Sequence, residues 1–158
     1  MDNNHTRKNI MDKKSDTVRG NPRYMTSYRS ELAGIISLLK YIKKNGLSNT
    51  PIDMWCDNEA VVNILTEERE LNVTDLDMAE YDLVSVGKEL MKRLTKVTLQ
   101  HVKGHQTDVM RYEVLTFEAQ LNEDCNKEAK ERMRSGEETM TRPKPTAGSK
   151  AMLYLKKT

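Results

Sequence analysis

The sequence has few cysteines, few aromatic residues and no long apolar run. Among its 158 residues are one tryptophan, one phenylalanine and two cysteines, Cys56 and Cys125, which lack the paired spacing of a zinc site. The opening MDNNHTRKNI is too polar for a signal peptide or a membrane span. A glycine-rich phosphate loop and a nucleophile elbow are also missing. We therefore expect a soluble intracellular protein with no membrane partner, in either the cytoplasm or the nucleus.

The charges nearly cancel. Twenty-six basic and 24 acidic residues leave a formal charge of +2, so affinity for nucleic acid must come from local patches. Lys88, Lys92, Arg93 and Lys96 form one such group, but helix ends commonly carry basic residues that offset the helix dipole. We favour a solvated helix end over a nucleic-acid contact for this group.

The central part of the chain alternates between helical and strand patterns. Apolar residues recur at helical spacing from Ser27 to Lys44, with Thr26 or Ser27 available as the N-cap. The further elements that we predict are a strand at 52–56, a short helix in NEAVVNIL, a helix at 77–94, a strand at 97–102 and a helix from Phe117 to about Arg134. This order is typical of an α/β fold with a mostly parallel sheet.

The two ends of the chain differ from this central part. Residues 1–23 form a polar segment that we interpret as a flexible leader, and residues 24–135 form the domain. Residues 136–158 hold two of the four prolines and are predicted to be a tail, in which AMLYL is a candidate docking segment. Two strands are too few for a sheet in a domain of this size, so sheet structure is missing upstream.

Four segments carry candidate chemistry: SYRSELAGI around Glu31, MWCDNEAV around Asp57, LQHVKGHQTD around His105 and EAQLNEDCNKEAKE around Asn126. Glu31 and Asp57 are 26 residues apart, and Asp57 and Asn126 are 69 apart. In order and spacing, the four segments resemble the ribonuclease H family, and most of all the ribonuclease H region of retroelement reverse transcriptases. The resemblance extends from about Gly20 to Glu131.

The resemblance implies a five-stranded mixed sheet flanked by helices. In that family an antiparallel meander of three strands precedes the first helix, and its central strand supplies the first metal-binding aspartate. Only about 25 residues precede the first predicted helix in this chain, and they do not have the pattern of three strands. The resemblance therefore predicts an N-terminally truncated ribonuclease H-like domain.

Members of the family cleave the RNA strand of RNA–DNA hybrids with two divalent ions about 4 Å apart, held by converging carboxylates. The resemblance places Glu31 and Asp57 at this metal site, with Mg²⁺ or Mn²⁺ as the cofactor. Each residue also has a purely structural interpretation. Glu31 near a helix start would offset the helix dipole, and Asp57 could be the N-cap of the following helix.

Two of the family's acidic ligands have no counterpart at the matching positions. Asn126 stands in LNEDCNKEAK where the family has its fourth carboxylate. Asp124 lies two residues earlier, roughly 200° around the helix, and cannot simply replace it. Asp12 and Asp16 are the nearby candidates for the missing first aspartate, and both lie in the leader. The resemblance thus predicts weak hydrolysis or none.

The remaining site residues are carried over from the family's hybrid-binding elements. His105 in KGHQ matches a histidine that assists product release or proton transfer, while His101 is expected to be packed within its strand. Asn58 is placed to contact a 2′-hydroxyl, Lys103 a phosphate, and Gly104 would allow a close backbone turn. Trp55 is expected in the core.

Three classes of function remain open. The first is a metal-dependent RNA–DNA hybrid endonuclease in which Glu31, Asp57, His105 and Asn126 form the catalytic site. The second is a non-catalytic retroelement remnant that keeps only weak nucleic-acid affinity. The third is an interaction module whose exposed sheet edge pairs with a partner chain that completes the sheet.

Overall fold

The structure is a computed structural model that describes residues 26–135. The predicted leader, the predicted tail with AMLYL, and the candidate ligands Asp12 and Asp16 lie outside these residues. The helices are α1 (Ser27–Lys44), α2 (Glu59–Thr66), α3 (Tyr81–Arg93) and α4 (Phe117–Ser135), and the strands are β1 (Ile52–Cys56) and β2 (Val97–His101). Short 3₁₀ turns occur at Val73–Asp77, Gln106–Asp108 and Tyr112–Val114. The predicted order of helices and strands is confirmed.

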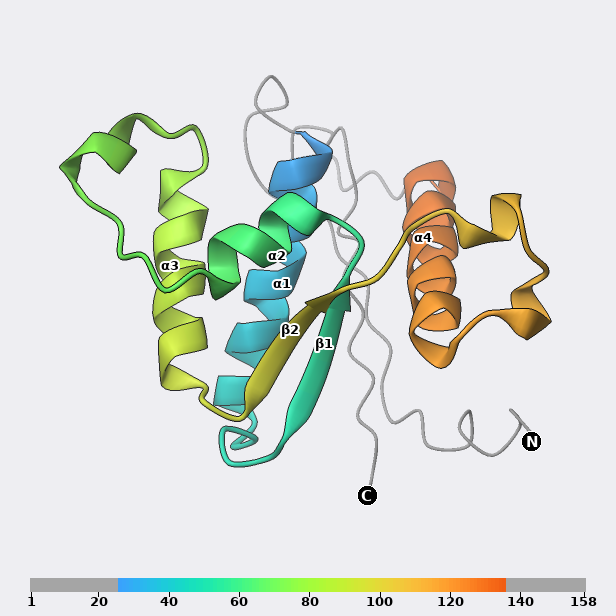
Figure 1. Ribbon diagram of the computed structural model, residues 1–158, viewed down its shortest axis with the longest axis horizontal. Helices are drawn as coiled ribbons and strands as arrows, with labels where there is room; N and C mark the ends of the chain where they lie inside the picture. Colours follow the sequence, from blue (N-terminus) through green and yellow to red (C-terminus); the bar gives the residue numbers. More distant parts are fainter. Residues whose placement is uncertain (1–25, 136–158) are drawn as a thin grey trace.

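The two strands form a parallel sheet, in which Ile52 is opposite Val97 and Cys56 is opposite His101. An α/β fold is therefore confirmed, while the five-stranded arrangement of the ribonuclease H family stays a prediction. In Figure 1, α1, α2 and α3 lie on one side of the sheet and α4 lies on the other. Between residues 26 and 135 no helix is both long and apolar enough to cross a membrane.

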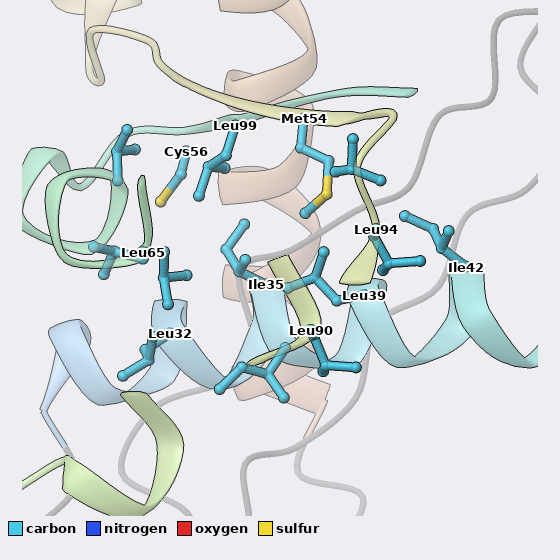
Figure 2. Packing of buried hydrophobic residues seen from close by; sticks show 14 of the residues in the cluster. Leu32, Ile35, Leu39, Ile42, Met54, Cys56, Leu65, Leu90, Leu94 and Leu99 are labelled. Carbon is cyan, nitrogen blue, oxygen red and sulfur yellow. The ribbon is translucent and has the colours of Figure 1, made fainter. Parts of the chain in front are cut away.

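The main core lies between the sheet and α1, α2 and α3. Alternate β1 side chains face it, because successive side chains of a strand point to opposite faces. Figure 2 shows Met54, Cys56 and Leu99 pointing from the strands toward Leu32 and Ile35 of α1. The labelled residues of this cluster are all at most 7% exposed. This packing fixes the end of β1, and so the position of Asp57, relative to α1.

A smaller cluster lies on the opposite side of the sheet. Val102, Leu115 and Ala119 are buried there, and Trp55 and Tyr112 pack against them. Trp55 is half-buried in this second cluster, so the expectation of a core position is met only in part. The cluster joins α4 to the sheet beside the carboxyl end of β1.

Helix α3 begins later than the sequence pattern predicted. A helix was expected from Asp77, but Val73–Asp77 is a 3₁₀ turn and α3 starts at Tyr81. Asn72 and Asp75 form a capping box at this turn, and Arg69 pairs with Asp75 at 2.8 Å. These local hydrogen bonds stabilise a separate turn, so the helix cannot extend upstream through it.

Candidate metal centre

Glu31 is held at the site by α1. Thr26 caps this helix by accepting a hydrogen bond from the Arg29 N–H at 3.1 Å, and the Arg29 guanidinium pairs with Asp82 of α3 at 2.9 Å. Glu31 lies beyond the first helical turn, which contains no acidic residue, and is only 6% exposed. A charge buried this deeply is costly. Its position therefore needs more explanation than a surface interaction with the helix dipole.

Asp57 directly follows β1, at the edge of the sheet where ligands bind in open α/β folds. The N-cap of α2 is Asn58, whose side-chain oxygen accepts a hydrogen bond from the Val61 N–H at 3.2 Å. The structural interpretation of Asp57 as the N-cap is therefore wrong. Asn58, predicted to contact a hydroxyl, uses its oxygen for capping.

Cys56 was missed in the sequence as a candidate ligand. Its Sγ is a donor to Glu31 Oε2 at 3.8 Å, and it accepts a hydrogen bond from the Asn58 N–H at 3.4 Å. Burial raises the pKa of the Cys56 thiol to about 12, the Asn58 N–H lowers it, and the Glu31 charge raises it further. In the absence of a metal the thiol is therefore protonated at neutral pH.

Glu31, Cys56 and Asp57 form a group that can hold a metal ion. One potential ligand atom from each residue lies within 4.8 Å of those of the other two. The group combines a helix residue with two residues at the end of a strand, so the fold brings together positions far apart in the sequence. The predicted convergence of Glu31 and Asp57 is confirmed by this proximity of their ligand atoms, while the identity of the ion stays a prediction.

Helix α4 brings two asparagines to this end of the sheet. The Asn122 amide donates to Asp57 Oδ2 at 3.3 Å, a contact that the sequence analysis missed. Asn126 follows one turn later, on the same side of the helix. Asn126 is 8% exposed, and its Nδ2 is buried without a hydrogen-bond partner. An unsatisfied buried donor costs about 1–3 kcal/mol, so this position is unfavourable as it stands.

The KGHQ loop lies against Asp57. A Cβ atom added to Gly104 would be 3.0 Å from Asp57 Oδ2, so this close approach of the loop leaves little room for a side chain at position 104. The residue of this loop with a left-handed backbone is His105, with φ 55°. Lys103 and His105 are both exposed next to the site.

Helix α4 also anchors this loop. Glu123 accepts hydrogen bonds from the Gln106 N–H and the Thr107 hydroxyl, both at 3.0 Å. The neighbouring Asp124 accepts a hydrogen bond from the Tyr112 hydroxyl at 2.9 Å. Asp124 is therefore occupied elsewhere, in agreement with the prediction that it does not replace Asn126.

Two surface predictions have different outcomes. His101 is exposed, so the expectation of a packed histidine is wrong; β2 ends there and the side chain is not covered. Three residues of the basic group lie on α3 and are paired with acidic side chains: Lys88 lies 3.5 Å from Glu67, Lys92 2.7 Å from Glu70, and Arg93 2.5 Å from Glu89. Lys96 lies after the helix and is exposed. This pairing supports a solvated helix end.

The side chains do not fit a pair of Mg²⁺ ions. Mg²⁺ prefers octahedral oxygen ligands, and two such ions need several shared carboxylates. Within residues 26–135 the centre offers the carboxylates of Glu31 and Asp57, a buried thiol at Cys56 and the neutral amide of Asn122. This donor set is suited to one ion.

Comparisons of the chain with family models, with curated proteins and with solved structures found no match. Functional inference therefore depends on the residues of the site itself.

Proposed function

We propose that this chain is a ribonuclease H-like domain that binds a divalent cation and an RNA–DNA hybrid at the carboxyl end of its sheet, without efficient cleavage. One observation carries the proposal. Glu31 and Asp57 come from different elements, and they lie together with Cys56 within 4.8 Å although Glu31 is only 6% exposed. Two carboxylates this close repel each other unless a cation or a proton neutralises them.

The hybrid-binding part of the proposal is supported by the KGHQ loop. Gly104 lies against Asp57, so the exposed Lys103 and His105 border the cation site. A lysine ammonium can contact a phosphate while the cation contacts another oxygen of the same backbone. This arrangement suits recognition of a nucleic-acid backbone by shape rather than by base sequence.

The lack of efficient cleavage follows from the charges. Hydrolysis of a phosphodiester needs an activated water and a neutralised leaving oxygen, which two ions supply in this kind of chemistry. Asn126 is neutral where the resemblance expects a carboxylate, and the set of ligands suits one ion. The charge that develops in the transition state is then poorly stabilised.

Fluorescence anisotropy with a labelled RNA–DNA hybrid tests this proposal. Mn²⁺ is expected to tighten binding to the natural protein, and the double variant Glu31→Gln, Asp57→Asn should lose this dependence. The double variant Asp77→Asn, Glu113→Gln is a control that removes the same charge from exposed positions. Binding that responds equally to Mn²⁺ in all three proteins would refute the cation-linked site.

A cleavage assay with the same hybrid tests the second half of the proposal. In Mg²⁺ and in Mn²⁺, the natural protein is expected to cleave no faster than Glu31→Gln. Cleavage above that background would show that a reduced set of ligands supports catalysis, and the domain would then be an enzyme.

A second candidate is an interaction module. Within the described part of the chain the sheet has only two strands, so the outer edge of each has no neighbouring strand there. Such edges readily pair with another chain. Light scattering coupled to size-exclusion chromatography should then show association at high concentration, and a strict monomer would exclude self-pairing.

A further inference from the structure

The donor atoms of the candidate centre include one sulfur. Cys56 belongs to the group of three together with the two carboxylates, and its Sγ is directed at Glu31 Oε2. Mg²⁺ and Ca²⁺ prefer oxygen ligands, whereas thiolate sulfur favours Zn²⁺ and related transition metals. A centre for a hard ion does not need a thiol at this position.

We propose that the centre binds a single thiophilic divalent ion of the Zn²⁺ type, with Cys56 as a sulfur ligand beside Glu31 and Asp57. This inference rests on the cation binding proposed above and specifies which ion the centre selects. It adds to the resemblance, which implied Mg²⁺ or Mn²⁺ held by carboxylates alone.

The distances between the potential ligand atoms of the three residues are close to those between the ligand atoms of a tetrahedral zinc site. Zn–S bonds of about 2.3 Å and Zn–O bonds of about 2.0–2.2 Å place neighbouring ligand atoms about 3.3–3.6 Å apart. Cys56 Sγ is 3.8 Å from Glu31 Oε2, and all three ligand atoms lie within 4.8 Å. Side-chain adjustments of about 1 Å would therefore complete the coordination.

Asn126 is a second observation that points to a ligand at this end of the sheet. The side chain is 8% exposed and its Nδ2 has no acceptor. It lies one helical turn after Asn122, which already donates to Asp57. A water or an anion in the fourth position of the ion would supply the missing acceptor, as in zinc sites that keep one position open.

Binding is a proton-for-metal exchange without oxidation or reduction. The S–H bond of Cys56 breaks, its proton goes to solvent, and the sulfur lone pair forms the bond to the ion. Two carboxylates and one thiolate then surround the divalent charge. At pH 7 the exchange should release roughly one proton for each ion bound.

Titration of the reduced protein with Co²⁺, followed by absorbance, tests the inference. Coordination by Cys56 predicts a sulfur-to-cobalt charge-transfer band that saturates at one equivalent and disappears when Zn²⁺ is added. An excess of Mg²⁺ should not displace the cobalt. Cys56→Ser should lose the band and weaken Zn²⁺ binding by about 10- to 100-fold or more, since even changes to residues behind the ligands have effects of that size.

Two further variants keep the test decisive. Cys125→Ser replaces the other buried cysteine, outside the group of three, and should retain the band. Asp57→Asn should weaken Co²⁺ binding but keep the sulfur band, which covers the case in which Cys56→Ser fails to fold.

The outcomes separate the two proposals. Cation binding without a sulfur band, unchanged in Cys56→Ser, would overturn the thiolate inference alone. A sulfur band without any hybrid binding would overturn only the nucleic-acid part of the proposed function. No binding of Co²⁺, Zn²⁺ or Mn²⁺ would overturn both the thiolate inference and the cation site.

Discussion

Replacing Asn126 by aspartate tests whether α4 completes the cation centre. The natural amide is 8% exposed and leaves its Nδ2 without a partner. Asn126→Asp keeps nearly the same shape but places a carboxylate on α4 one helical turn beyond Asn122, whose amide contacts Asp57. Its effect on folding should therefore depend on whether a cation is present.

The energetic cost of the new carboxylate and the stabilisation that a bound cation can return are of similar size. Without a cation, burial and repulsion should raise the pKa of the new carboxyl above its unfolded value of about 3.9. Below a pH of about 3.9 the variant is as stable as the natural protein. Its free energy of unfolding then falls as the pH rises from there through the folded pKa. An uncompensated buried charge costs about 3–5 kcal/mol at neutral pH. A cation at 1,000 times its dissociation constant returns about 4 kcal/mol.

Urea unfolding at pH 7 measures the cost of the buried carboxylate in EDTA and the stabilisation by the cation in excess Mn²⁺. Asn126→Asp should be the less stable protein in EDTA and should gain more from Mn²⁺ than the natural protein. Asn49→Asp, at an exposed loop position, is the matched control and should respond to neither condition. Equal Mn²⁺ stabilisation of Asn126→Asp and the natural protein would refute the placement of Asn126 at the centre.

Three further predictions concern the surroundings of the centre. Gly104→Ala puts a Cβ 3.0 Å from Asp57 Oδ2 and should weaken cation binding by about tenfold in a metal titration. Gly87→Ala puts a Cβ 2.7 Å from Leu65 Cδ2, and overpacking of about 1–3 kcal/mol should exceed the gain of about 1 kcal/mol in helix propensity, lowering the thermal midpoint. The pKa of Cys56, raised to about 12, contributes stability that is complete below the unfolded pKa of about 8.5 and is lost as the pH rises toward 12. Compared with Cys56→Ser in urea unfolding, the natural protein should therefore lose about 1.4 kcal/mol per pH unit across this range.

Much of the fold could be predicted because it depends on local patterns. The periodic apolar residues and the N-cap predicted the bounds of the helix Ser27–Lys44. The bounds of the strand Ile52–Cys56 were predicted from Pro51 before it and the helix after it. The start of α3 was predicted wrongly. Asn72 and Asp75 form a capping box for the separate 3₁₀ turn Val73–Asp77. In the sequence the same two polar residues look like the start of an ordinary α-helix, so the turn was not distinguished from α3.

The candidate site was only partly accessible from the sequence. Glu31 and Asp57 could be paired because both fit a spaced pattern. Cys56 was judged by its spacing from the other cysteine, yet its role depends on how β1 packs against α1. The contact between Asn122 and Asp57 spans 65 positions, and no local signal reports it.

The most direct test of the proposed function is hybrid binding measured with and without Mn²⁺ in the natural protein and in Glu31→Gln, Asp57→Asn. The proposed cation centre predicts that Mn²⁺ tightens binding of the natural protein and has no effect on the double variant. Identical binding curves for the two proteins in Mn²⁺ would contradict a cation-linked hybrid site at the carboxyl end of the sheet.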